Sequence, residues 1–141
     1  MSSPSPVQSE ALAQLRTQID SLDAQLLTLL NQRATVAEQV GELKRQEGTP
    51  FFRPDRVAQV IQKMQAGNAG PLQNAHVAAI WREIMSACLA LEVPQRVAVL
   101  GPQGTFCEQA AIEYFGSAAN LVYCGSFDDV FHATAAGTAQ F

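Results

Sequence analysis

The sequence predicts an all-α segment of three helices over residues 9–93, followed by an incomplete α/β segment over residues 96–141. Three observations lead to this fold class. Apolar residues recur three and four apart from Leu12 to Leu43, as they do along one face of a helix. Two further stretches with helical spacing follow, separated by glycines and prolines. After Arg96, short apolar runs alternate with helical stretches, which is typical of a parallel sheet.

The first helix is expected to begin after Ser9 as its N-cap and to run to about Gln46. Gly48 and Pro50 then end it, and residues 1–8 are expected to form a disordered tail. More than thirty helical residues exceed what a small monomeric domain usually buries, so the helix favours packing against a second copy of the chain. Its apolar seam consists of Leu12, Leu15, Ile19, Leu22, Leu26, Leu29, Val36, Val40 and Leu43.

A cation interrupts this seam. Arg33 lies where packing would favour an aliphatic side chain, so its charge must meet an anion or be badly desolvated. Lys44 follows eleven residues later and returns to nearly the same face. Arg16 lies roughly 25 Å from Arg33 on a straight helix, so only an antiparallel second copy could bring both to one ligand. The alternative is a coiled-coil spacer in which Arg33 sets the register and the other two cations are solvated.

Two shorter helices are expected next. One starts with Pro54 in its first position and ends near Gly67, and the other covers about Asn74 to Glu92. On the third helix Cys88 and Glu92 are four residues apart and share a face. The residues expected to face inward are Val57, Val60, Ile61 and Met64 on the second helix and Val77, Ile80, Ile84 and Leu91 on the third.

The pattern changes at Arg96. A turn at residues 101–105 joins the first strand to a helix, and a ligand of phosphate or carboxylate size would bind at this loop and helix start. Two strands cannot close the core of such a sheet. We therefore expect the segment to be truncated at Phe141, about where a third strand would begin. The expected strands are 97–100 and 121–124, and the expected helices are 106–115 and 127–136.

Composition excludes several classes of function. The net charge of −4 argues against nucleic-acid binding, and all nine Lys and Arg residues fall between Arg16 and Arg96. The chain has neither a secretory signal nor an apolar run of membrane-spanning length, so we expect no membrane partner and a cytoplasmic location. The three cysteines show no CxxC spacing and the two histidines are isolated, so no disulfide framework, metal site or cofactor is predicted.

Several motifs resemble known families. The runs ALAQLRTQIDSLDAQLLTLLNQRATVAEQVGELK, RPDRVAQVI and IWREIMSACLALE resemble the all-helical class of chorismate mutase. The run RVAVLGPQGTFCEQAA resembles the opening of a prephenate dehydratase domain. In this order they are similar to the bifunctional chorismate mutase/prephenate dehydratase family of phenylalanine biosynthesis. The resemblance implies an intertwined homodimer that converts chorismate to prephenate without a cofactor or covalent intermediate. Dehydratase activity is not expected from the truncated second segment.

The resemblance also implies roles for individual residues. Arg16 of one subunit and Arg33 of the other grip the two carboxylates of chorismate. Lys44 and Glu92 meet the ether oxygen as negative charge grows on it, and Glu92 must be protonated to donate a hydrogen bond there. The catalytic residues are therefore expected to be Lys44, Glu92 and Arg33, and the further substrate-binding positions are Arg16, Arg53, Arg56 and Cys88.

Two positions depart from the family pattern. Val57 stands where the family commonly has a Glu that binds the substrate hydroxyl, and it also continues the apolar stripe of its helix. Cys107 stands where Ser or Thr is usual, and we do not expect it to act as a nucleophile. Two alternatives to the enzyme remain. One is a mutase-like module that has lost activity and serves in dimerisation or binding, and the other is a plain helical interaction protein.

Overall fold

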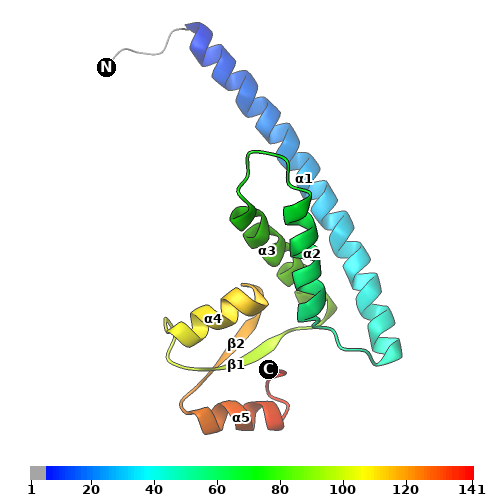
Figure 1. The fold of residues 1–141 in the computed structure, drawn as a ribbon, viewed down its shortest axis with the longest axis vertical. Coiled ribbons are helices and arrows are strands. Elements are labelled where there is room, and N and C mark those ends of the chain that lie inside the picture. Colours follow the sequence, from blue (N-terminus) through cyan, green and yellow to red (C-terminus); the bar gives the residue numbers. More distant parts are fainter. Residues whose placement is uncertain (1–5) are drawn as a thin grey trace. The chain divides into compact units, whose positions relative to one another are not determined.

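The computed structural model describes residues 6–141, and helices followed by a small α/β segment make up this part of the chain (Figure 1). It divides into two compact units, one ending at Thr35 and the other beginning at Val36, and each is described by itself. No helix in residues 6–141 combines the length and apolarity needed to span a membrane. The elements are α1 (Pro6–Glu47), α2 (Pro54–Ala66), α3 (Asn74–Glu92), β1 (Arg96–Leu100), α4 (Phe106–Phe115), β2 (Asn120–Cys124) and α5 (Phe127–Ala135).

The first helix starts earlier than its sequence suggests. Because α1 begins at Pro6, the expected N-cap at Ser9 is wrong, and so is a disordered tail that extends to residue 8. Proline suits the first position of a helix, since its φ is already helical and it has no N–H to leave unpaired. Residues 1–5 of the expected tail lie outside the described residues. At the other end Gly48 adopts a φ of +69°, which ends the helix, and the Thr49 N–H donates to the Lys44 carbonyl at 3.1 Å.

The apolar seam of α1 is uncovered in the single chain. Its nine residues are between 41% and 60% exposed, although the sequence pattern suggests a buried face. A continuous apolar stripe of this length on a surface marks an interaction site. The seam therefore needs a covering that the chain does not supply by itself.

Helices α2 and α3 have the predicted bounds and pack against each other. The apolar stripe of α2 is half-buried as expected, Val57 included. On α3 two expected inward positions are wrong, because Ile80 and Leu91 are 44% and 52% exposed. Val77 is buried as predicted, and Cys88 and Glu92 are buried in addition. Ile80 and Leu91 lie roughly 100° or more around the helix from Glu92.

The α/β segment, residues 96–141, contains the predicted parallel sheet. Strands β1 and β2 pair from Arg96 opposite Asn120 to Leu100 opposite Cys124. On the other edge of β1, the Phe141 N–H donates to the Arg96 carbonyl at 3.4 Å and the Phe141 carbonyl accepts from the Ala98 N–H at 2.6 Å. Phe141 thus bonds to Arg96 and Ala98, the two residues on either side of Val97, which is the hydrogen-bond pattern of a parallel pair of strands. The core of the segment is formed by Val97, Val99 and Ala111, with Phe115, Ala119 and Leu121 packed against them.

Candidate functional site

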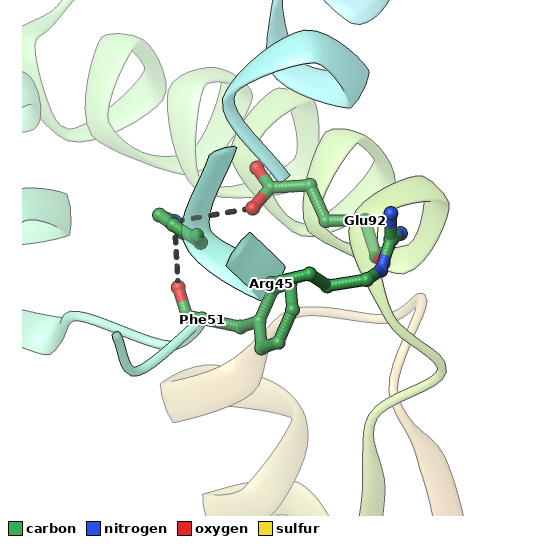
Figure 2. A network of polar contacts seen from close by, with 4 residues as sticks. Arg45, Phe51 and Glu92 are labelled. Carbon is green, nitrogen blue, oxygen red and sulfur yellow. Dashed lines mark hydrogen bonds and ion pairs between the residues drawn. The ribbon is translucent and has the colours of Figure 1, made fainter. Parts of the chain in front are cut away.

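An ion pair joins the end of α1 to the end of α3. The Lys44 ammonium donates to Oε2 of Glu92 at 3.1 Å and to the carbonyl oxygen of Phe51 at 3.0 Å (Figure 2). The Glu92 side chain is only 9% exposed and that of Lys44 is 23% exposed. Charges are costly to bury unless they are paired and hydrogen-bonded, and this pair meets both conditions. The structure thus brings together two of the residues that the sequence predicts as catalytic.

Close helix packing makes this contact possible. A β-carbon on Gly41 would lie 2.9 Å from Cγ and 3.0 Å from Cβ of Glu92, so only glycine lets α1 approach α3 so closely. Gly41 is itself buried. Gly41 was not predicted as part of the site, although a glycine inside a helix costs about 1 kcal/mol relative to alanine and often marks close packing.

Arg45 contacts the two residues that surround the Lys44 ammonium, Glu92 and Phe51. Its Nη2 donates to the Glu92 backbone carbonyl at 2.7 Å, which satisfies a carbonyl at the C-terminus of α3 that has no partner inside the helix. Its guanidinium also lies over the Phe51 ring, 5.9 Å from the ring centre. Arg45 therefore contacts both residues that accept hydrogen bonds from Lys44. Figure 2 labels Arg45 together with these two residues, Phe51 and Glu92. Neither Arg45 nor Phe51 is recognisable from sequence spacing, because their contacts depend on the tertiary fold.

Three more predicted residues lie in the same unit. Cys88 is 6% exposed and lies one turn before Glu92 on the same face of α3. Arg53 makes a two-pronged contact with Asp55, with Nε to Oδ1 at 2.9 Å and Nη2 to Oδ2 at 2.6 Å. This hydrogen-bonded contact raises the pKa of Arg53 and lowers the pKa of Asp55. Arg56 is exposed in the first turn of α2. The role of each stays a prediction.

The two remaining predicted residues belong to the unit that ends at Thr35. Arg16 is exposed and Arg33 is partly buried, and both lie on α1. Their convergence with Lys44 on one ligand therefore stays a prediction, which requires a second copy of the chain.

A cavity of about 770 Å³ lies elsewhere, between α3 and the start of α4. None of the residues predicted for the mutase site lines it, so it is separate from the Lys44–Glu92 pair. Gly104, Thr105 and Phe106 do line it, and they belong to the loop and helix start where the sequence predicts a ligand of phosphate or carboxylate size, which stays a prediction. The lining of the cavity also includes Arg82, Glu83 and Glu108. The Tyr123 O–H donates to Glu108 at 2.6 Å, and this contact, followed by one from the Gly104 N–H, lowers the pKa of Glu108. Across residues 6–141 no three or more His, Cys, Asp or Glu side chains gather in a group that could hold a metal ion.

Comparison with known proteins gives two family matches. The profile of the family "Chorismate mutase type II" matches residues 15–93, and that of "Prephenate dehydratase" matches residues 97–141. The chain is 45% identical over 137 residues to the bifunctional chorismate mutase/prephenate dehydratase of Pseudomonas aeruginosa, covering 94% of this chain and 38% of that protein. The protein of the same name from Neisseria gonorrhoeae is 49% identical over 123 residues, covering 86% of this chain and 33% of that protein.

A solved structure matches the helical part. The chorismate mutase (Form II) of Thermus thermophilus superposes with a TM-score of 0.57 at 28% sequence identity, covering 58% of this chain and 93% of that chain. The chain thus spans nearly the whole of this relative but less than two fifths of the two bifunctional ones.

Proposed function

This chain belongs to the chorismate mutase type II family, and from that premise we propose that it catalyses the rearrangement of chorismate to prephenate. The observation that carries the proposal is the buried contact between Lys44 and Glu92, at 3.1 Å, inside a helical fold similar to that of a chorismate mutase. A charged pair at this depth is expensive as a purely structural device. The Lys44 ammonium of this pair is well suited to an oxygen atom on which negative charge develops during a reaction.

The protein catalyses this reaction by positioning the substrate and by stabilising charge. The ether C–O bond breaks as a new C–C bond forms, so neither a nucleophile nor a metal is required. Catalysis consists of holding chorismate in its folded conformer and stabilising the negative charge that grows on the ether oxygen. Lys44 supplies a fixed positive charge for this oxygen, since its ammonium is already oriented by Phe51 and Glu92.

Glu92 acts as the second donor to the ether oxygen. An ionised carboxylate would repel the growing charge, so Glu92 must carry a proton when the substrate is bound. Its position supports a place beside the ether oxygen, because the side chain is 9% exposed and its Oε2 lies 3.1 Å from the Lys44 ammonium. Cys88, one turn earlier on the same face, then lines the pocket beside it.

The site is completed by a second copy of the chain. The exposed seam of α1 supports this part of the proposal, because its nine apolar residues need a partner. Arg16 of that copy and Arg33 of the first would grip the two carboxylates of chorismate through bidentate contacts. The distance between these two positions along one helix, roughly 25 Å, prevents a single copy from supplying both.

Loss of the ultraviolet absorbance of chorismate tests the proposal directly. The parent chain is expected to convert chorismate, and Lys44→Met to lower kcat/KM by about 100-fold or more, because one electrostatic donor is removed. The matched control is Lys63→Met, which changes the chain's other lysine at an exposed position on α2 and should leave the rate unchanged. A parent chain that leaves chorismate intact would exclude the proposed reaction.

A further inference from the structure

Two neighbouring phenylalanines connect the mutase site to the α/β segment. The carbonyl of Phe51 accepts the hydrogen bond from Lys44 at 3.0 Å. The next residue, Phe52, turns its ring toward α4 and the end of the chain. Its ring centre lies 5.8 Å from that of Tyr114, 5.0 Å from that of Phe115 and 5.4 Å from that of Phe141.

These four rings form one cluster with the core of the α/β segment. Phe115 lies 5.0 Å from Tyr114 and 5.2 Å from Phe141, ring centre to ring centre. It also packs against the buried core residues of the segment. Ring centres 5.0 to 5.8 Å apart, with edge or tilted geometry, are the favoured arrangements of aromatic pairs. Phe52 is therefore the point at which the helical part is anchored to the second segment.

Polar contacts reinforce the same junction. The Ala118 N–H donates to Oγ of Ser86 at 3.3 Å, and the Ser117 N–H donates to Glu83 at 3.3 Å. Both acceptors lie on α3, the helix that carries Glu92. The α/β segment thus contacts α3 as well as the loop of residues 48–53, which joins α1 to α2 and is called the 48–53 loop below.

We propose that the α/β segment positions the mutase site through the contact between Phe52 and Tyr114, so that residues 96–141 contribute to the proposed mutase reaction. This inference rests on the proposed function. A loop of six residues has no regular secondary structure to fix the Phe51 carbonyl, and the aromatic cluster supplies that restraint from the outside. Phe52 and Tyr114 are positioning residues, because they act on Lys44 only through the carbonyl of Phe51.

A change confined to the α/β segment tests the idea in the full chain. Tyr114 is 56% exposed, so Tyr114→Ala removes its ring contact with Phe52 without emptying the core. We expect kcat to fall about fivefold with KM changed less than about twofold, because Lys44 is misplaced while the carboxylate grip is intact. Tyr114→Phe keeps the ring and should restore kcat. The control is Phe131→Ala, which removes an aromatic ring that is 70% exposed on α5 of the same segment.

Hydrogen exchange provides a readout that does not depend on activity. The Thr49 N–H donates to the Lys44 carbonyl at 3.1 Å at the start of the 48–53 loop. Its exchange should speed up about tenfold in Tyr114→Ala and stay unchanged in Phe131→Ala. Unchanged exchange and unchanged kcat in Tyr114→Ala would overturn the inference while the parent's activity upholds the proposed function. Faster exchange in Tyr114→Ala, together with a parent chain that cannot convert chorismate, would support the restraint and overturn the proposed function.

Discussion

Besides Val77 and Cys88, the helical part buries polar and charged side chains, whereas the α/β segment buries mainly aliphatic ones. In the helical part α3 buries Glu92 and Ser86 to 9% and 7% exposure, while the apolar seam of α1 is exposed. In the α/β segment the buried residues are mainly aliphatic, such as Val97 at 4% and Val99 at 7%. Buried charge beside exposed hydrocarbon is the reverse of what the hydrophobic effect favours in an isolated chain.

Burial of side chains has a different consequence in each of the two parts. The α/β segment excludes water from its own core, which stabilises the fold. The helical part excludes water from a charged pair, which strengthens electrostatic interactions at that point, while its apolar seam on α1 is exposed. The comparison therefore predicts that changes near Glu92 affect catalysis most, whereas changes within the α/β segment away from the Phe52–Tyr114 contact affect mainly its own stability.

The largest expected effect comes from dividing the site between two copies. Arg16→Ala and Lys44→Met should each lower kcat/KM by about 100-fold or more. Mixed after unfolding and refolding together, they should regain about a quarter of the parent activity, because about half of the dimers are then mixed and each of these has one intact site. The chorismate assay measures the recovery. A mixture no more active than its components would mean that the two residues serve one site within a single chain.

The next effect concerns the hydrogen bond that Glu92 is proposed to donate. Glu92→Gln keeps a neutral donor of the same length, whereas Glu92→Ala removes the donor. We expect Glu92→Gln to keep kcat/KM within about tenfold of the parent and Glu92→Ala to lower it by about 100-fold. The chorismate assay measures kcat/KM for both variants. Equal values for the two variants would show that the side chain at position 92 does not donate to the substrate.

A smaller effect on kcat is expected from adding a side chain at Gly41, where α1 and α3 approach each other closely. In Gly41→Ala the added carbon would lie 2.9 Å from Cγ of Glu92, so α3 must shift. The gain in helix propensity, about 1 kcal/mol, opposes the cost of overpacking, about 1–3 kcal/mol. The free energy of unfolding should therefore fall by about 0–2 kcal/mol, while kcat falls about tenfold. Gly67→Ala is the matched control, since its nearest neighbour is 3.5 Å away. Equal kcat in both variants would show that the approach at Gly41 has no catalytic importance.

Local patterns in the sequence predicted most of the elements correctly. The periodicity of apolar residues predicts α2 and α3 with their bounds, and the alternation after Arg96 predicts the parallel sheet. The errors came from tertiary context. Pro6 extends α1 beyond the expected cap at Ser9, and the buried face of α3 is turned away from Ile80 because Glu92 takes the inner position.

The candidate site was predictable only in part. Arg33 interrupts an apolar seam, which is visible as a local anomaly, and the spacing of Cys88 and Glu92 places them on one face. The contact of Lys44 with Glu92 joins residues 48 positions apart, and without the resemblance to a family no periodicity pairs them. Arg45 was not predicted as a site residue, because its partners are a backbone carbonyl and an aromatic ring, and sequence spacing indicates neither contact.

The smallest expected effect lies in the α/β segment and is one of stability. Glu108 accepts a hydrogen bond from the Tyr123 O–H, which lowers the pKa of Glu108 below 4.5 and raises the pKa of Tyr123 above 10.0. A lowered carboxyl pKa stabilises the fold above about pH 4.5, and this contribution is lost as the pH falls through the folded-state value. A raised tyrosine pKa stabilises the fold below about pH 10, and this contribution is lost as the pH rises through the folded-state value.

Tyr123→Phe removes the O–H and with it the larger cause of the Glu108 shift, while the Gly104 N–H still donates to that carboxylate. Because the pair is largely accessible to solvent, the melting temperature at neutral pH should fall by at most about 2 °C. The difference between variant and parent should shrink toward acid pH, where the parent loses the same interaction, and mutase activity should be unchanged. Thermal unfolding followed at several pH values measures this. A large loss of mutase activity in this variant would break the separation of catalysis from stability on which the comparison of the two regions depends.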